Sequence, residues 1–175
     1  MSVGPRYRVH FRRRREGKTD YRVRLRLLRS GEPRAVVRFS GRRVRVAIVR
    51  YDPVGDRVVA AAESSELGPL GFPNASLAST PAAYLTAYLA GLRSKSAGAE
   101  TAVLDSGIRR PTEGGRLAAA LKGLLDAGVT VPHGEGGFPS PDRLSGAHLP
   151  KPLPQPLEAY KMKLPGLVAR PEAAA

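Results

Sequence analysis

The sequence contains no cysteine and only three histidines. Without cysteine, the chain can form neither disulfide bonds nor thiolate metal sites. The histidines, His10, His133 and His148, lack the spacing of metal ligands, so we expect no metal site. No apolar run approaches the roughly 20 residues of a membrane-spanning helix, and the N-terminus lacks the apolar stretch of a signal peptide. These absences predict a soluble intracellular protein that binds no metal ion and no membrane.

Catalytic signatures are also missing. The sequence has neither the G-x-S-x-G turn of hydrolases nor the G-x-x-x-x-G-K-[ST] phosphate-binding loop. Asp105 ends a predicted buried strand and could supply one ligand of a two-metal nuclease, but Asp52 and Asp56 belong to a predicted hairpin loop. We therefore expect Asp105 to bond backbone amides or an arginine such as Arg109. The sequence predicts no catalytic residue, no cofactor and no small-molecule substrate, and a metal-dependent nuclease of ribonuclease H-like fold is a disfavoured alternative.

Positive charge is concentrated in the first third of the chain. The net charge is +14, and residues 1–57 contain 18 basic and 5 acidic side chains. Residues 58–175 contain 11 basic and 10 acidic side chains, which leaves them nearly neutral. A polyanion that binds the basic third releases condensed counterions, so binding is expected to weaken steeply with salt. Nucleic acid is the expected partner.

Residues 6–29 combine this charge with aromatic rings. Tyr7, Phe11 and Tyr21 surround a run of four arginines, Arg12–Arg15. Guanidinium groups bind phosphate bidentately, and aromatic rings stack on unpaired bases at about 1–3 kcal/mol each. The segment therefore indicates RNA with exposed loops. A solvated tail, a localisation signal, an anionic membrane surface or a general nucleic-acid-binding architectural protein would use similar charge.

The second half of this segment alternates arginine with apolar residues, which predicts that it has one buried side. It contains too few large apolar residues to fold by itself, so we expect it to become ordered on RNA. The alternating residues are Arg22, Arg24, Arg26 and Arg29 with Val23, Leu25, Leu27 and Leu28.

Three strands are expected next, at residues 34–39, 43–48 and 57–62. In the second strand Val44, Val46 and Ile48 alternate with basic residues, so one face is apolar and the other faces solvent or RNA. The turn chemistry of residues 51–56 predicts a hairpin, and the three strands should form an antiparallel meander. Residues 68–74, rich in glycine and proline, are expected to form an exposed loop.

Two helices should follow. The first is expected to start at Thr80, as its cap, and to run to about Ser96, with an apolar stripe from Tyr84 to Leu92. A buried strand at residues 101–105 leads to a second helix at residues 116–127, and residues 129–131 are a candidate edge strand. The inward side of the second helix should consist of Leu117, Leu121, Leu124 and Leu125.

This order of elements predicts an α/β fold in which the meander is extended by β-α-β crossovers into a mixed sheet with helices packed on it. Three regions result: a basic RNA-binding arm at residues 1–29, an α/β core at residues 30–131 and a C-terminal segment at residues 132–175. The last segment contains nine of the 16 prolines. We expect it to be extended and dependent on a partner.

Six motifs in this order resemble a known family. They are GPRYRVHFRRRREGKTDYRVRLRLL at the start, SGEPRAVVR, YDPVGD, TPAAYLTAYLAGL, AVLDSGIRRPTEGGRLAAALKGLLDAGVTVPHGEG and FPSPDRLSGAHL, and they cover most of residues 4–149. The family is the archaeal type of large-subunit ribosomal protein number eighteen, which binds 5S rRNA.

The resemblance implies a non-catalytic protein of the cytoplasmic large ribosomal subunit. It implies that the protein attaches 5S rRNA to the large-subunit rRNA in the central protuberance, and that other large-subunit ribosomal proteins are its neighbours. It also implies that the arm lies against RNA and that the loop at residues 112–116 is a second contact. The candidate RNA-binding residues are Arg6, Tyr7, Arg8, Phe11, Arg12, Arg13, Arg14, Arg15, Lys18, Tyr21, Arg22, Arg24, Arg34, Arg43, Arg45, Gly114, Gly115 and Arg116.

Overall fold

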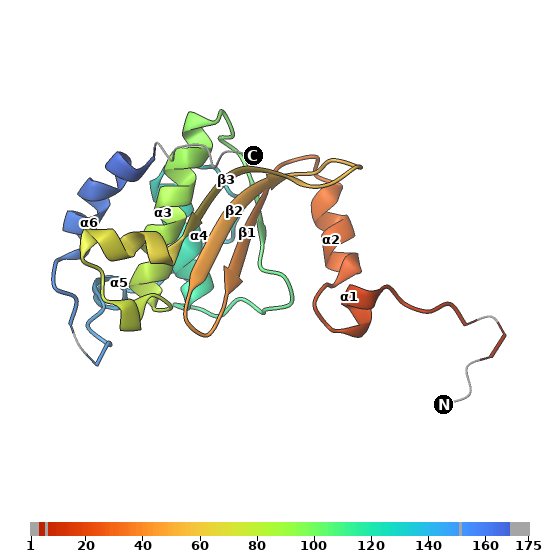
Figure 1. Ribbon diagram of the computed structural model, residues 1–175, viewed down its shortest axis with the longest axis horizontal. Coiled ribbons are helices and arrows are strands. Elements are labelled where there is room, and N and C mark those ends of the chain that lie inside the picture. The colour runs from red at the N-terminus through yellow and green to blue at the C-terminus, as the bar shows by residue number, and fades with distance from the viewer. Residues whose placement is uncertain (1–3, 6, 151, 169–175) are drawn as a thin grey trace.

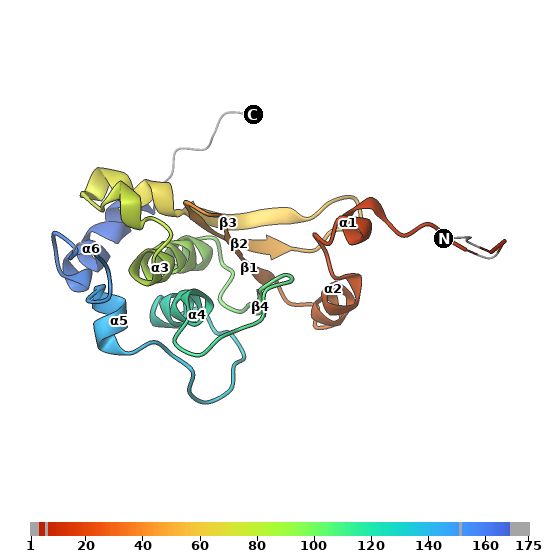
Figure 2. The same cartoon turned by 90° about the horizontal axis from the view of Figure 1, so that it is seen from below.

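A computed structural model describes residues 4–5, 7–150 and 152–168 of the chain. One layer is a β-sheet, and the long helices α3 (Thr80–Ser96) and α4 (Arg116–Asp126) cover one of its faces (Figure 2). The N-terminal arm lies at one end of the sheet and the C-terminal helices at the other (Figure 1). No helix in the described ranges is long and apolar enough to cross a membrane.

The sheet has four strands in the order β3-β2-β1-β4. β1 (Arg34–Phe39) pairs antiparallel with β2 (Val44–Arg50), which pairs antiparallel with β3 (Arg57–Glu63). β4 (Val103–Asp105) joins the other edge of β1 in parallel orientation. The predicted meander, its parallel extension and the α/β fold class are therefore confirmed. The candidate edge strand at residues 129–131 is reduced to one parallel bridge, between Thr101 and Thr130.

The apolar face of β2 lies against the helices, as its alternation predicts. Val44, Val46 and Ile48 are completely buried, whereas Arg45 on the opposite face is exposed. Ala35 of β1 is also completely buried beside them. The sheet thus has one face packed on helices and one face that carries arginine, which positions a basic surface on a rigid element.

Helix α3 is the central helix of the core. It runs to Ser96 as predicted, but its cap is Ser79 rather than Thr80, since the Ser79 hydroxyl accepts a hydrogen bond from the Ala82 amide. Helix α4 packs closely on it at Gly123, where a Cβ atom would collide with the Tyr84 carbonyl oxygen. This close approach explains why a glycine, which weakens an isolated helix, occupies the middle of α4.

Residues 68–74 differ from the exposed loop that their prolines and glycines suggest. Residues 68–70 end the 3-10 helix η1 (Ser64–Leu70), residues 71–73 connect it to the next turn, and Asn74 begins the short η2 (Asn74–Ser76). Leu67 is completely buried and Phe72 is 3% exposed. The segment folds because these two large side chains fill the core beside α3, whatever the backbone propensity of their neighbours.

The C-terminal segment is only partly extended. After irregular residues 132–140 come α5 (Pro141–Ser145), α6 (Leu157–Lys163) and η3 (Leu164–Leu167). Tyr160 and Leu164 are completely buried, and the Tyr160 ring lies 5.3 Å from that of Phe72. The expectation of extended structure is therefore wrong for residues 141–145 and 157–167, where apolar side chains complete the core, and the expected dependence on a partner stays a prediction.

Arg93 of α3 joins this segment to the rest of the core. Its guanidinium donates to the Ala61 carbonyl oxygen at 2.7 Å, to the Glu66 carboxylate at 2.7 Å and to the Leu167 carbonyl oxygen at 2.8 Å. Arg93 is 7% exposed, so these hydrogen bonds form in a poorly solvated site, where they are strong and where an unpaired charge would be costly.

The N-terminal arm contains two short helices, α1 (Arg12–Arg15) and α2 (Tyr21–Leu28). Neither helix has a buried residue, and Leu25 is 53% exposed. The predicted buried side of residues 22–29 is therefore reduced to half-buried positions, among them Leu27 and Leu28.

Candidate nucleic-acid interface

The arginine run forms a single helical turn. All four side chains of α1 are exposed, and a turn takes about 3.6 residues, so they point in four directions. Arg13 Nε donates to Thr19 Oγ1 at 2.8 Å, which closes the loop between α1 and α2. The Glu16 carboxylate lies 3.4 Å from Arg12 Nε and 2.8 Å from Lys18 Nζ, but ion pairs as exposed as these contribute little to stability. The turn therefore presents several guanidinium groups to an approaching polyanion.

Aromatic rings of the arm lie next to these charges. Phe11 is 71% exposed, and its ring is 5.2 Å from that of Tyr21 in a tilted arrangement. Tyr7 is 51% exposed and lies 6.2 Å from His10. Exposed rings beside guanidinium groups are suited to stack on unpaired bases while the charges bind the backbone.

Helix α2 begins at a capped residue. The Asp20 carboxylate accepts hydrogen bonds from the amides of Arg22 at 2.8 Å and Val23 at 3.2 Å. These hydrogen bonds hold the pKa of Asp20 below its ordinary value, and the one from the Val23 amide has the largest effect. An ionised Asp20 therefore helps to hold α2, a helix of eight residues that is too short to be stable alone.

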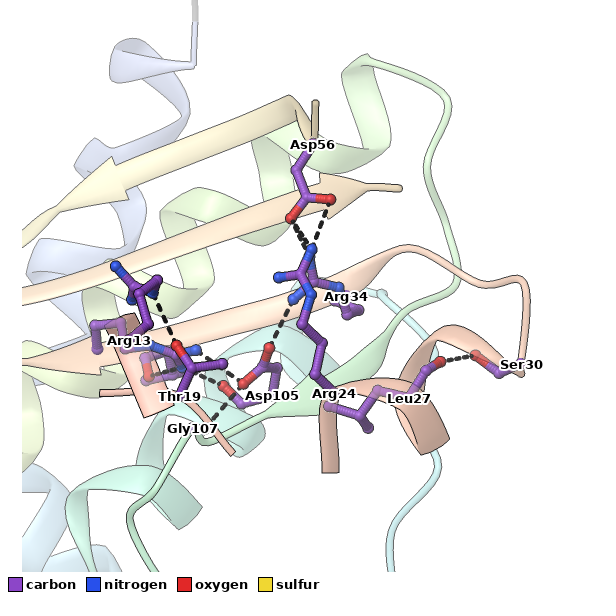
Figure 3. Close-up of polar contacts among 11 residues, drawn as sticks. Arg13, Thr19, Arg24, Leu27, Ser30, Arg34, Asp56, Asp105 and Gly107 are labelled. Carbon is purple, nitrogen blue, oxygen red and sulfur yellow. Dashed lines mark hydrogen bonds and ion pairs between the residues drawn. The ribbon is translucent and has the colours of Figure 1, made fainter. Parts of the chain in front are cut away.

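A network of ion pairs fixes α2 to the sheet (Figure 3). Arg24 of α2 donates to both oxygens of Asp56 in the β2–β3 hairpin, at 3.1 and 2.9 Å. Arg34 at the start of β1 bonds the same carboxylate at 2.5 Å and reaches Asp105 at 2.8 Å. Since Arg34 is 3% exposed, its role here is to support the arm from within the protein rather than to face RNA.

The Asp105 carboxylate is bonded by two arginines and a backbone amide. Besides Arg34, it accepts a hydrogen bond from Arg38 Nη2 at 2.9 Å and another from the Gly107 amide at 2.9 Å. Burial raises its pKa, but Arg38 and the other donors outweigh burial, and the pKa lies below the ordinary value. The expected amide and arginine bonds are confirmed, although Arg109 instead reaches the Phe39 carbonyl oxygen at 3.4 Å. No group of three possible metal ligands occurs in the described part of the chain.

A cleft of about 400 Å³ separates the arm from the sheet. Basic side chains from both sides line it, together with Asp20, Asp105 and the ring of Tyr21. Because the arm supplies one wall and β1 the other, a ligand in this cleft would contact both regions of the molecule. The basic lining residues are Arg13, Lys18, Arg24, Arg34 and Arg38.

The cleft continues onto the open face of the sheet. Strand register aligns Arg38 of β1 with Arg45 of β2 and Glu63 of β3. Arg45 and Arg43 both bond Glu63, at 3.1 and 3.3 Å, and their side chains remain 68% and 56% exposed. Burial raises the pKa of Glu63, while the hydrogen bonds of Arg45 and Arg43 bring it below the ordinary value. Arg38 is not among the residues predicted from the sequence. Neighbouring residues of a strand point to opposite faces, so its position next to buried Val37 could have placed it on this face.

The polar groups of the loop at residues 112–116 already form hydrogen bonds with other residues of the protein. The Gly114 amide donates to the Gly137 carbonyl oxygen at 2.9 Å, and the Gly115 amide donates to that of Thr112 at 3.1 Å. Arg116 donates to the Ala78 carbonyl oxygen at 2.9 Å and lies 5.1 Å from the centre of the Phe39 ring. These groups have less capacity to bind phosphate than the arginines of the arm.

The other predicted residues divide by exposure. Arg6 lies outside the described residues. Tyr21 and Arg24 are half-buried. The exposed members of the arm are Tyr7, Arg8, Phe11, Arg12, Arg13, Arg14, Arg15, Lys18 and Arg22.

Residues 5–97 match the family described as "Ribosomal large subunit proteins 60S L5, and 50S L18". The chain belongs to this family. Among similar proteins, that of Methanoregula boonei is 48% identical over 149 residues, or 85% of each chain, and that of Korarchaeum cryptofilum is 50% identical over 85% of this chain and 76% of its own. The protein of Methanococcoides burtonii is 46% identical over 94% of this chain and 97% of its own. All three are named large ribosomal subunit protein uL18.

Family membership confirms the predicted resemblance and assigns the chain a structural role in the large ribosomal subunit. It also makes ribosomal RNA and other ribosomal proteins the general partners of the chain. The proteins that the chain matches are ribosomal proteins rather than nucleases.

Proposed function

We propose that this protein binds 5S rRNA and attaches it to the large-subunit rRNA in the central protuberance. The observation that carries the proposal is the continuous basic surface from α1, through the cleft, to Arg38, Arg43 and Arg45 on the open sheet face. The arm and the sheet are separate elements, so the surface can contact RNA over an extended path. Exposed rings of the arm would stack on unpaired bases, and the arginines would bind phosphates.

The core and the N-terminal arm would have different roles in binding RNA. The core and the ion pairs at Asp56 set where the arm starts, and α1 carries contacts that become productive when RNA is present. Each phosphate that is neutralised releases about 0.7 to 0.9 counterions, so the logarithm of the affinity should fall by several units per tenfold rise in salt. A general architectural protein would show the same salt effect without preference for one RNA.

The test is a titration of the full chain with 5S rRNA, in which transfer RNA and duplex DNA compete at physiological salt. We expect preference for 5S rRNA, because stacking and shape add to the charge. Equal binding to all three polyanions would overturn the proposal and favour the architectural alternative.

A matched pair of variants tests the role of the arm. Replacing Arg12, Arg14 and Arg15 by alanine leaves the Arg13–Thr19 bond intact and should weaken binding to 5S rRNA by roughly 100-fold, at about 1 kcal/mol for each of the three contacts. The control replaces Arg143, Lys161 and Lys163, the same number of charges at the opposite end of the molecule. Equal losses in the two variants would mean that net charge, not the arm, controls binding.

A further inference from the structure

A second hollow lies on the helix side of the protein, away from the basic surface. It has a volume of about 290 Å³ and runs between α4, the end of β4 and the loop at residues 133–137. We call it the α4 groove. Its apolar floor consists of Leu104, Leu117 and Leu121, of which Leu117 is 7% exposed and the other two are half-buried. An apolar floor beside open solvent is typical of a surface that another molecule covers.

The charge of the α4 groove is opposite to that of the cleft beside the arm. Glu113 and Glu135, both exposed, are its charged lining residues, and the lining includes no lysine or arginine. The cleft beside the arm, by contrast, has five basic lining residues. Two carboxylates repel the phosphates of RNA, so RNA is a poor occupant of this groove. A cationic segment with apolar side chains fits both the floor and the rim.

The walls of the groove are preformed. The hydrogen bond from the Gly114 amide to the Gly137 carbonyl oxygen, at 2.9 Å, holds the two wall loops together. His133 Nδ1 is 2.7 Å from the Val131 carbonyl oxygen, and its ring lies 5.5 Å from that of Phe138. A binding site that needs little reorganisation loses less free energy to ordering when its ligand arrives.

Glycine leaves one wall open to a peptide backbone. Gly134 lines the groove, and a Cβ atom there would meet nothing within 4 Å, so the wall has room for a larger side chain. The φ angle of Gly134 is not positive, which means that a larger side chain can be introduced there without backbone strain. The wall is therefore both a feature of the site and a convenient place to block it.

We propose that the α4 groove binds an extended, basic segment of a neighbouring large-subunit protein, in which leucine-like side chains alternate with lysine or arginine. The leucines would cover the floor, and the basic side chains would pair with Glu113 and Glu135. The molecule then has two partner surfaces of opposite charge, one for RNA and one for protein. This inference rests on membership of the large subunit and does not depend on which RNA the arm binds.

The probe is an eight-residue peptide of alternating leucine and lysine, compared with a leucine–glutamate peptide and an RNA oligonucleotide of equal length. Amide NMR of the full chain locates binding, and fluorescence anisotropy gives the affinity. We expect the basic peptide alone to shift resonances of residues 117–121 and 133–137, which lie outside the predicted RNA contact at residues 112–116. Shifts of these resonances by RNA, or their absence with the basic peptide, would overturn the proposal.

Variants separate the floor from the rim. Gly134→Trp fills the groove and should weaken peptide binding by about tenfold or more, because the apolar anchor loses its pocket. Glu113→Gln with Glu135→Gln keeps the shape and should weaken binding roughly threefold to tenfold, as expected for two exposed charge pairs. Gly166→Trp is the control, since a Cβ there also meets nothing within 4 Å and the site lies on η3.

Circular dichroism and urea unfolding first establish that each variant folds. If Gly134→Trp did not fold, the two glutamine substitutions would decide the question by affinity and by NMR. Unchanged affinity in the folded groove variants, or an equal loss in Gly166→Trp, would assign the peptide to another surface and refute the proposal. Binding to 5S rRNA is measured in the same samples and should be unchanged by Gly134→Trp, which lies outside the loop at residues 112–116.

Discussion

The two terminal segments of this protein both look irregular in sequence, one because of arginine and the other because of proline, yet they are stabilised in opposite ways. The arm forms α1 and α2 without a buried residue and relies on a cap and ion pairs. The C-terminal segment buries Leu144, Tyr160 and Leu164 in the core. Order at a chain end therefore depends on how many apolar anchors reach the core, not on the proline content around them.

Burial against the core, rather than the spacing of apolar residues, separates the two segments. Tyr160 and Leu164 are four residues apart, so they lie on one side of the helical segment, and Pro165 stands in the first turn of η3, where it is tolerated. Pro156 precedes the first helical residue, where a missing amide is harmless. In α2, Tyr21, Leu25 and Leu28 also share one side of the helix, but none of them is buried and Leu25 is 53% exposed, so this side does not reach the core.

The largest expected effect comes from removing the main anchor of the C-terminal segment. Tyr160→Ala deletes a completely buried ring and its contact with Phe72, so the free energy of unfolding should fall by about 3–5 kcal/mol. Urea unfolding of the full chain measures this change. Tyr7→Ala, in the arm, is the matched control and should leave the midpoint unchanged. A small effect at Tyr160 would show that the C-terminal segment is no more integrated than the arm.

A smaller effect is expected where the arm meets the core. Asp56→Asn removes the charge shared by Arg24 and Arg34 and should lower the free energy of unfolding by about 1–3 kcal/mol, because Arg34 stays buried with one carboxylate fewer. Amide exchange in α2 should accelerate more than exchange in β1. The control is Asp52→Asn, whose partner Arg57 is 80% exposed. Unchanged exchange in α2 would mean that the arm is held by other contacts.

The smallest effect should be confined to the arm itself. The pKa of Asp20 is depressed in the folded chain, so its stabilisation of α2 is present above the ordinary pKa and is lost as pH falls through the folded pKa. Acid should therefore reduce the helix content of residues 21–28, which is measured from Hα chemical shifts. Asp20→Ala should show the reduced content already at neutral pH and lose the acid dependence, with the same global unfolding midpoint. Glu16→Gln is the control, and a persistent acid transition in Asp20→Ala would assign it to another group.

Much of the core follows from local pattern. The alternation around Val44, Val46 and Ile48 was sufficient to place β2 and its basic face, and Pro81 near a hydroxyl residue marked the start of α3 to within one position. The pattern overestimated burial in α4, where Leu121 and Leu125 remain half-buried. Period alone cannot tell whether a neighbouring element exists to cover each side of a helix.

The site was less predictable than the fold. The exposed arginines of α1 and the rings beside them could be named from composition, since a dense basic run has few ways to be buried. Arg24 and Arg34 could not be told apart from them, because their partners Asp56 and Asp105 are distant in sequence. Whether an arginine faces solvent or a carboxylate depends on which loops and strands the fold brings together.

The sequence by itself determined the segregation of charge, the meander, the two long helices and the family, since these rest on local periodicity, turn chemistry and motif order. Only the tertiary structure decided that Phe72 and Tyr160 belong to the core, that Arg34 is internal, and that an acidic apolar groove lies apart from the basic surface. Such features arise from contacts between residues far apart in the chain, and their free energies are known only when the partner positions are known.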